Sequence, residues 1–457
     1  MARACSDFSR TELVRRGLAE AGRGLPAIER GMPLPAGTGL DRRSFLARSA
    51  GLALAVYGGQ ALVPRALEHG IAAAAAAPPD RVLVSVFLDG GADSLSMLFP
   101  NGDARYRKLR PRLALPPGAG RPFTEDDRLR WHPSLEPLAT LHGEGKVTVL
   151  PGIGYAGADQ SHFTSRHYWE VGATSDSLRT GWLGRYLDRV GSPDNPLQGL
   201  SLQSRLQPAL ATARVPVAAI DAPDSYDFPT RGVWGDVERR LLDAMAELGA
   251  LPTGGDAALA QAGAAARQAA QLRTQLLPFA GKAAAAPVAY PTGSDDDFPR
   301  RLAGLAAMLA AGLPVRVASL EAPGMYDTHD DQPEALTESL RLTADSLFAF
   351  QRDLEARGLA DRVLVHVWSE FGRRAEENGS NGTDHGAAGM GFLIGSRVRG
   401  RAIGEFPGLS RLDDHGNLRA TADFRGLYAA ILEQWLGTDA DGIIPGARRF
   451  DRRRILR

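Results

Sequence analysis

The clearest pattern in the chain is a set of short apolar runs without polar alternation. Such runs are typical of strands that are covered on both faces of a sheet, because neither face meets water. They predict strands at residues 81–88, 146–150, 314–320 and 363–368, and weaker ones at 197–202, 215–220 and 392–394. The order strand, loop, helix, strand from residue 314 to residue 368 predicts a βαβ unit, so its two strands should be parallel neighbours or near neighbours.

Helical periodicity separates many of these runs. An apolar stripe from Leu336 to Leu354, closed by Gly358, predicts an amphipathic helix. Other helices are expected at residues 235–248, 257–277, 299–311 and 422–436, and one should begin near residue 161. Alternating strands and helices indicate an α/β fold. Residues 221–297, about 75 positions with two of these helices, are interpreted as a helical insertion into it.

The segment 41–63 has a different pattern, with paired arginines before a short, weakly apolar run. Arg42 and Arg43 precede Ser44-Phe45-Leu46, and the alanine run 72–77 offers small residues for cleavage. This pattern is typical of a twin-arginine export signal. The apolar run is too short for a membrane span. An internal helix beginning at Asp41 is the alternative.

This interpretation divides the chain into three parts. We expect a leader at 1–40, the signal at 41–77 and one folded domain at 78–457. The exported protein would be periplasmic, in the cell envelope or extracellular, with the twin-arginine translocation machinery as a partner.

Composition narrows the chemistry. Lys+Arg and Asp+Glu both number 53, so the formal net charge is zero and nothing favours nucleic acid or an anionic membrane as a partner. The single cysteine, Cys5, lies upstream of the signal. The mature protein would therefore have no disulfide, no thiolate metal site and no cysteine nucleophile.

Acidic residues and histidines gather where the predicted strands end. The candidates are Asp93 (or Asp89) after the first strand, Asp327 and His329 after the strand at 314–320, Glu370 after the strand at 363–368, and Asp384 with His385 on the following loop. Ligands of open α/β sheets collect at the carboxyl ends of strands, so these side chains are placed for metal chemistry.

A structural interpretation of the same residues stays open. Glu370 could pair with the nearby Arg373, Asp384-His385 could cap a turn, and Asp93 could belong to an ordinary Gly-Asp turn.

Ser161 stands at the start of a predicted helix and is the best candidate nucleophile, with Thr164 second. A helix amino terminus favours a bound anion and lowers the free energy of an alkoxide. The alternative is that Ser161 only caps the helix.

Several motifs, in order along the chain, resemble those of the bacterial family named domain of unknown function 1501. They are Arg42-Arg43, FLDGGADSL at 87–95, Ser161-His162-Phe163, GWLGRY at 181–186, YDTH at 326–329, SEFGR at 369–373, GTDHG at 382–386 and TADFR at 421–425. That family is similar to the alkaline phosphatase and sulfatase superfamily.

The resemblance implies an alkaline-phosphatase-like three-layer sandwich with a central, mostly parallel sheet and two divalent metal ions. The ions would be Zn²⁺, Mn²⁺, Mg²⁺ or Ca²⁺. One would take Asp93 (or Asp89), Ser161 and Asp384-His385; the other would take Asp327 and His329, with Glu370 nearby. The chain departs from the superfamily pattern because it offers no clear late histidine for the first metal and no formylglycine motif.

Three functions follow as expectations. The first is an exported metal-dependent hydrolase of phosphate or sulfate esters, in which Ser161 or a metal-bound hydroxide attacks and Arg166 or Arg373 holds the anion. Its substrate would be a small anionic ester or a glycan. The second is a non-catalytic exported binding protein on the same fold, and the third is an envelope scaffold.

Overall fold

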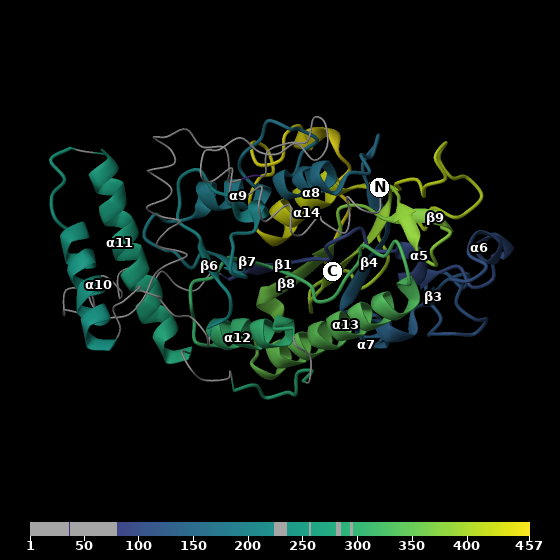
Figure 1. The fold of residues 1–457 in the computed structure, drawn as a ribbon, viewed down its shortest axis with the longest axis horizontal. Helices are drawn as coiled ribbons and strands as arrows, with labels where there is room; N and C mark the ends of the chain where they lie inside the picture. The colour runs from purple at the N-terminus through teal and green to yellow at the C-terminus, as the bar shows by residue number, and fades with distance from the viewer. Residues whose placement is uncertain (1–35, 37–79, 224–234, 256, 280–284, 293–295) are drawn as a thin grey trace.

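The computed structural model describes residues 36, 80–223, 235–255, 257–279, 285–292 and 296–457 (Figure 1). Apart from Ala36, the predicted leader and export signal lie outside the described residues. Within the described part, no helix combines the length and apolarity that a membrane crossing requires.

An eight-stranded sheet forms the centre of the protein, with strand order β12-β4-β11-β8-β1-β7-β5-β6. Its strands are β1 Val82–Phe87, β4 Val147–Gly154, β5 Gly199–Leu202, β6 Ala218–Ile220, β7 Val317–Glu321, β8 Val363–Trp368, β11 Gly389–Ile394 and β12 Ala422–Asp423. β11 pairs antiparallel with β4 and β8, and the other pairings are parallel. The predicted βαβ unit is confirmed, with β1 inserted between β7 and β8.

Helices cover both faces of this sheet (Figure 1). One layer contains α7 Glu136–Gly143, α12 Phe298–Ala310 and α13 Gln332–Ala356, and the other contains α8 His162–Val171, α9 Trp182–Val190 and α14 Phe424–Ala430. The three-layer α/β sandwich with a mostly parallel sheet is therefore confirmed.

The side chains of β1 show why its apolar run lacks polar alternation. Val82, Val84 and Val86 pack into the core under α12 and α13, whereas Leu83 and Phe87 pack into the core under α9 and α14. Because each face of the strand lies against a helix layer, neither needs polar residues.

Several element boundaries differ from the sequence prediction by a few residues, and two of them have a clear physical cause. β4 continues through Pro151 to Gly154, because its neighbours β11 and β12 still pair with it there, at Ile153 and Gly154. The final helix begins at Phe424, since Ala422 and Asp423 form β12 and the Asp423 carboxylate caps the helix by accepting from the Arg425 backbone N–H.

Two helices occupy the predicted insertion, α10 Gly235–Gly249 and α11 Ala257–Leu276. Figure 1 shows them side by side beyond the β6 edge of the sheet. At the other end lies a hairpin of β9 Arg373–Glu377 and β10 Thr383–His385, which carries part of the candidate site.

Candidate metal centre

Three elements at the carboxyl edge of the sheet bring their side chains together. His162 is the first residue of α8, Asp327 lies in the loop after β7, and His385 ends β10. Their potential ligand atoms all lie within 4.8 Å of one another, the one such group of three found in the described part of the chain.

A fourth side chain, His329, completes a set around one oxygen of Asp327. The Oδ1 atom of Asp327 lies 3.4 Å from His162 Nε2, 3.1 Å from His329 Nε2 and 3.5 Å from His385 Nε2. The Nε2 atoms of His329 and His385 are 2.9 Å apart. Three imidazoles therefore present the same ring nitrogen to one small volume.

The other ring nitrogen of each histidine is held by an oxygen. Nδ1 of His162 lies 2.7 Å from Glu370 Oε1, and Nδ1 of His385 lies 2.7 Å from the Gln160 carbonyl oxygen. Nδ1 of His329 lies 3.3 Å from Asp384 Oδ1. With a metal ion bound, such contacts would keep the proton on Nδ1 and leave the Nε2 lone pair for the ion. Without an ion, an Nε2–H group can donate to Asp327 Oδ1 instead.

Asp327 is kept ionised by the cationic Arg373. The fully buried guanidinium of Arg373 donates to Asp327 Oδ1 at 2.6 Å. Burial opposes ionisation of Asp327, but hydrogen bonds from the three histidines and the charge of Arg373 outweigh it and hold the pKa of the carboxyl well below its usual range. The carboxyl group of Asp327 is thus anionic at neutral pH.

Glu370 supports the cluster from the fully buried end of β8. It accepts from the backbone N–H groups of Gly90 and Gly91 at 3.0–3.3 Å as well as from His162. Burial opposes its ionisation, but the hydrogen bond and charge of His162 prevail, so the pKa of Glu370 is lowered. The expected alternative, a structural pair of Glu370 with Arg373, is not what the structure shows.

Gly90 allows the loop that binds Glu370 to lie close to the backbone of Asp327. With φ at +120°, it places its backbone where a Cβ atom would lie 2.3 Å from the Asp327 backbone nitrogen. Only glycine fits there.

The ligand atoms of His162, Asp327 and His385 lie close enough together for one divalent metal ion, and His329 contacts Asp327 and His385 from outside that group of three. Two ligands at about 2.0–2.1 Å from a tetrahedral ion lie about 3.3 Å apart, and the contacts around Asp327 Oδ1 span 3.1–3.5 Å. Three imidazoles and one carboxylate favour Zn²⁺ or Mn²⁺ over Mg²⁺ and Ca²⁺, which prefer oxygen. The side chains of His329, His385 and Asp327 are 15%, 11% and 18% exposed, so the cluster is open to solvent.

Ser161 lies beside the cluster at the amino terminus of α8. Its side chain makes no capping hydrogen bond, and its Oγ atom is buried without a hydrogen-bond partner among the described residues. Both its chain neighbours touch the cluster, Gln160 through its carbonyl oxygen and His162 as a member. The capping role considered for this serine is therefore not used.

Arg166, one turn further along α8, lies in a separate polar network. Its buried guanidinium contacts the carboxylates of Asp89, Glu170 and Glu321 at 2.7–3.2 Å. Burial raises the pKa of Asp89 to about 7, against the opposing charge of Arg166 and with help from Glu321 and Glu370. Arg166 would have to give up one of these contacts to hold a substrate anion.

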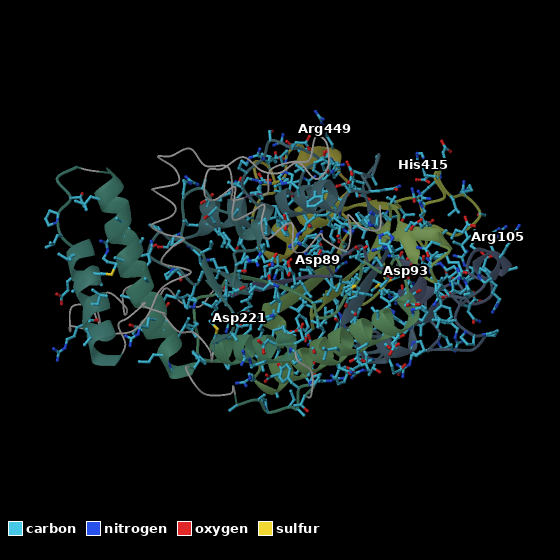
Figure 2. All side chains as sticks on the ribbon, viewed as in Figure 1. Asp89, Asp93, Arg105, Asp221, His415 and Arg449 are labelled. Carbon is cyan, nitrogen blue, oxygen red and sulfur yellow. The ribbon has the colours of Figure 1, made fainter. Side chains whose placement is uncertain are left out.

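Asp93 is occupied elsewhere, although it follows the first strand as the sequence suggested (Figure 2). Its two oxygens accept from Arg110 at 2.5 and 2.8 Å, from Ser96 at 2.6 Å and from Gln332 at 2.7 Å. It is not among the residues whose ligand atoms converge.

Of the eight predicted site residues, the structure brings three into contact at the cluster, Asp327, His329 and His385. Glu370 and Asp384 contact its histidines from behind, Ser161 is adjacent to it, and Arg166 and Asp93 belong to other networks.

Sequence reasoning missed His162, which supplies the third imidazole. The signal that could have found it is its position directly after Ser161, at the start of a helix that follows a buried strand.

Comparisons with known proteins bear on the fold and the family. No curated protein sequence matches the chain. Among solved structures, it is similar to a protein in the alkaline phosphatase superfamily from Vibrio parahaemolyticus (10% identity, TM-score 0.34, 89% of this chain and 78% of that one). It is also similar to the C-terminal periplasmic domain of EcEptC from Escherichia coli in complex with Zn (9%, 0.36, 81% and 85%). A third is the lipoteichoic acid synthase LtaP from Listeria monocytogenes (8%, 0.35, 79% and 73%).

Similarities this low carry no inference about activity. The family match is different in kind, because it covers residues 157–440, which include Ser161 and every member of the histidine cluster. The chain belongs to the family described as "Protein of unknown function (DUF1501)".

Proposed function

We propose that this protein is a metal-dependent hydrolase of phosphate or sulfate esters, with one divalent ion held by His162, His329, His385 and Asp327. One observation carries the proposal: three Nε2 atoms face one carboxylate oxygen, while every Nδ1 atom is held by an oxygen behind it. Histidines that bind metal ions almost always donate their other ring N–H to an oxygen in this way.

The ligands favour one ion rather than the two that the family resemblance implies. A bound ion would supply Lewis-acid stabilisation of the ester's anionic oxygens. The chain's own residues prepare the place for it, because Arg373 keeps Asp327 ionised and Glu370, Asp384 and Gln160 fix the imidazole rings.

Ser161 is the proposed nucleophile. Its Oγ has no hydrogen-bond partner among the described residues, and it stands at the amino terminus of the ten-residue helix α8. The aligned backbone dipoles of that helix favour negative charge at Ser161 and at an anionic ester beside it. Attack of Ser161 on phosphorus or sulfur would place negative charge at these same positions.

Export by the twin-arginine route remains part of the proposal, and its support is the Arg42-Arg43 motif alone. It is tested separately, by following Arg42→Lys/Arg43→Lys in cell fractions. Loss of the variant from the exported fraction would support it, and unchanged export would contradict it.

The first experiment measures metal. We expect about one equivalent of Zn²⁺ or Mn²⁺ in the purified full-length protein and a strong loss in His385→Ala, which removes one Nε2 ligand. His415→Ala is the matched control, because His415 is exposed on a turn outside the cluster. A wild type that takes up no metal even after reconstitution would contradict the proposed site.

The second experiment separates catalysis from binding. Ser161→Ala should keep its metal and lose at least about 10³-fold in kcat on 4-nitrophenyl phosphate or sulfate, because the nucleophile is gone. Unchanged turnover in this variant would exclude Ser161 as the nucleophile. A metal-loaded wild type that turns over neither type of ester would favour the binding protein instead.

A further inference from the structure

We propose that the surface formed by residues 397–401 and 452–457, the arginine surface, binds an anionic glycan. These two short segments contain seven arginines and no acidic residue, although the whole chain has zero formal charge. The neutral total thus conceals a strongly basic region.

The two segments are paired through their backbones. Val398 forms an antiparallel bridge with Leu456, Arg399 N–H donates to the Ile455 carbonyl at 2.8 Å, and Arg457 N–H donates to the Arg397 carbonyl at 3.1 Å. Val398 is fully buried, whereas the arginines on either side of it are exposed. The fold therefore fixes the arginines on one surface.

This arrangement does not stabilise the fold by itself. The bridge sets Arg397 opposite Arg457, and like charges directly opposite each other are unfavourable. Arg397, Arg399 and Arg401 make no side-chain hydrogen bond or ion pair with the described residues. In the second segment, Arg452 pairs with Glu433 and Arg453 with Asp451, and the other two arginines donate to backbone carbonyls. An external polyanion would relieve this repulsion.

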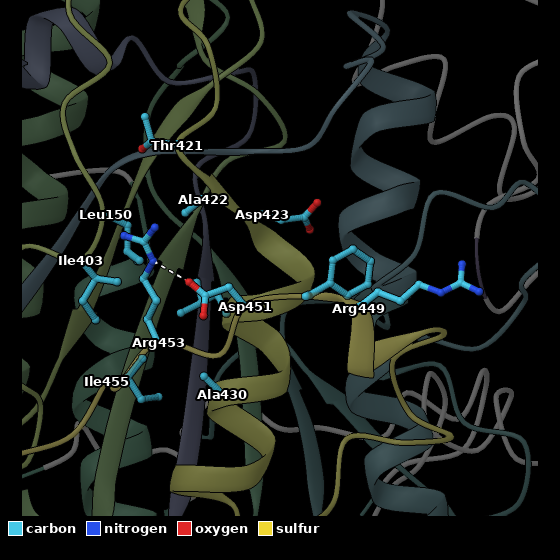
Figure 3. A pocket seen from close by; sticks show the side chains of 12 residues that line it. Leu150, Ile403, Thr421, Ala422, Asp423, Ala430, Arg449, Asp451, Arg453 and Ile455 are labelled. Atoms are coloured by element: carbon cyan, nitrogen blue, oxygen red, sulfur yellow. Dashed lines mark hydrogen bonds and ion pairs between the residues drawn. The ribbon is translucent and has the colours of Figure 1, made fainter.

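A cleft beside the arginine surface suggests the kind of polyanion. Figure 3 shows Leu150, Ile403 and Ile455 on one wall and Asp423 and Arg449 on the other. Apolar side chains with a few polar groups at the rim suit the face and hydroxyl groups of a sugar ring. Sulfate, phosphate or carboxylate groups on the same chain would lie over the arginines.

Two other polyanions fit less well. Single-stranded nucleic acid needs exposed aromatic rings for base stacking, but the two segments contain none and Phe450 is stacked under Arg425 at 4.2 Å. An anionic bilayer favours apolar side chains that insert between lipids, whereas Val398 and Ile455 are buried.

The arginine surface lies away from the metal cluster. It follows β11, whose Ile394 pairs with Val147 at the amino-terminal end of β4, whereas the cluster lies at the carboxyl edge. The inference therefore does not rest on the proposed hydrolase activity.

The test measures binding of fluorescent heparin, a sulfated glycan, to the metal-loaded protein at 50 mM and 200 mM salt. We expect Arg397→Gln/Arg399→Gln/Arg401→Gln to bind at least about 10-fold more weakly at 50 mM salt. The slope of log K against log salt should shrink by about 2, since each lost contact contributes about 0.7. The melting temperature should not change, because these side chains have no bonds to lose.

The matched control is Arg105→Gln/Arg128→Gln/Arg341→Gln, which removes three exposed arginines that each pair with a local carboxylate. It should bind heparin within about 2-fold of wild type. Equal binding by both triple variants would overturn the proposal, as would tighter binding of the wild type to poly(dT) or to phosphatidylglycerol vesicles than to heparin.

Discussion

Two aspartates near the carboxyl edge of the sheet, Asp93 and Asp327, make the same kind of ion pair and differ in everything around it. Each bonds the guanidinium of a fully buried arginine, Arg110 at 2.5 Å and Arg373 at 2.6 Å. Around Asp93 the remaining donors are Ser96 and Gln332, which both donate to Oδ2, while Oδ1 accepts from Arg110. Around Asp327 the remaining neighbours are three imidazole nitrogens.

The comparison shows that a buried Asp–Arg pair does not by itself reveal the role of the aspartate. With neutral donors it closes a network and holds α5 Ser94–Met97 to α13. With imidazoles whose other nitrogens are engaged, it holds a carboxylate that faces three Nε2 atoms. The groups that face the carboxylate, and not the arginine that pairs with it, therefore distinguish the two sites.

The largest expected effect is that of Asp93→Ala on stability. It leaves the Arg110 charge buried without its carboxylate, so the free energy of unfolding should fall by about 3–5 kcal/mol. Urea denaturation followed by circular dichroism measures this. A loss below about 1 kcal/mol would show that the Asp93 pair is not structural.

Asp327→Ala is the contrasting variant. Arg373 would still donate to four backbone carbonyl oxygens, whereas Arg110 without Asp93 would keep two, those of Arg374 and Ala375. The stability loss should therefore be smaller than for Asp93→Ala. Metal binding should be lost in Asp327→Ala and kept in Asp93→Ala. If the two variants lose metal equally, the distinction between the two aspartates is wrong.

The second prediction concerns the oxygens behind the imidazoles. Glu370→Gln removes the charge that orients His162 and turns an amide N–H₂ toward the Gly90 and Gly91 donors, so metal affinity should fall about 10–100-fold. Asp384→Asn should cost less, since the Asp384 side chain is 49% exposed and its contact with His329 is longer, 3.3 Å. Competition with a chromophoric chelator gives both constants. Equal losses would mean that burial of the orienting oxygen does not matter.

The sequence predicted the sheet well, because strands such as β8 Val363–Trp368 are buried on both faces and their apolar runs are unbroken. It also predicted that Asp327, His329 and His385 come together, since the βαβ rule places their loops at one edge. It could not separate Asp93 from Asp327, because Arg110 and Gln332 lie far from Asp93 along the chain. Donor sets of this kind are properties of tertiary packing.

A third aspartate, Asp89, extends the comparison, because its arginine is shared with two other carboxylates. Its pKa is raised to about 7, chiefly by burial. Burial also opposes ionisation of Glu321, but the charge of Arg166 together with hydrogen bonds from Gln207, Gln203 and Arg166 outweighs it and lowers the pKa of Glu321 to about 2. A carboxyl group with a raised pKa gives stability below its ordinary pKa that is lost as the pH rises to about 7. Asp89→Asn should therefore stabilise the protein by about 2 kcal/mol more at pH 8 than at pH 5.

The matched variant Glu321→Gln should act in the opposite sense. A carboxyl group with a lowered pKa stabilises the fold above its ordinary pKa, so removing it should destabilise the protein at neutral pH. Thermal melts of both variants from pH 4 to pH 8, after metal removal, check the pair. Parallel pH profiles for the two variants would contradict the assigned shifts.

The smallest effect should come from a histidine that the cluster does not use. His366 is buried mid-strand in β8, and neither ring nitrogen has a hydrogen-bond partner among the described residues. Burial lowers its pKa to about 3, so the stability that it allows above pH 6.5 is lost as the pH falls toward 3. His366→Leu should raise the free energy of unfolding by about 1 kcal/mol at pH 7 and reduce the loss of stability at acid pH.

The control is His142→Leu, which should destabilise the protein, because His142 bonds the Val147 carbonyl at 2.8 Å and Glu125 at 3.1 Å. If His366→Leu destabilises as much as His142→Leu, the His366 ring has a partner that the contacts around it do not reveal.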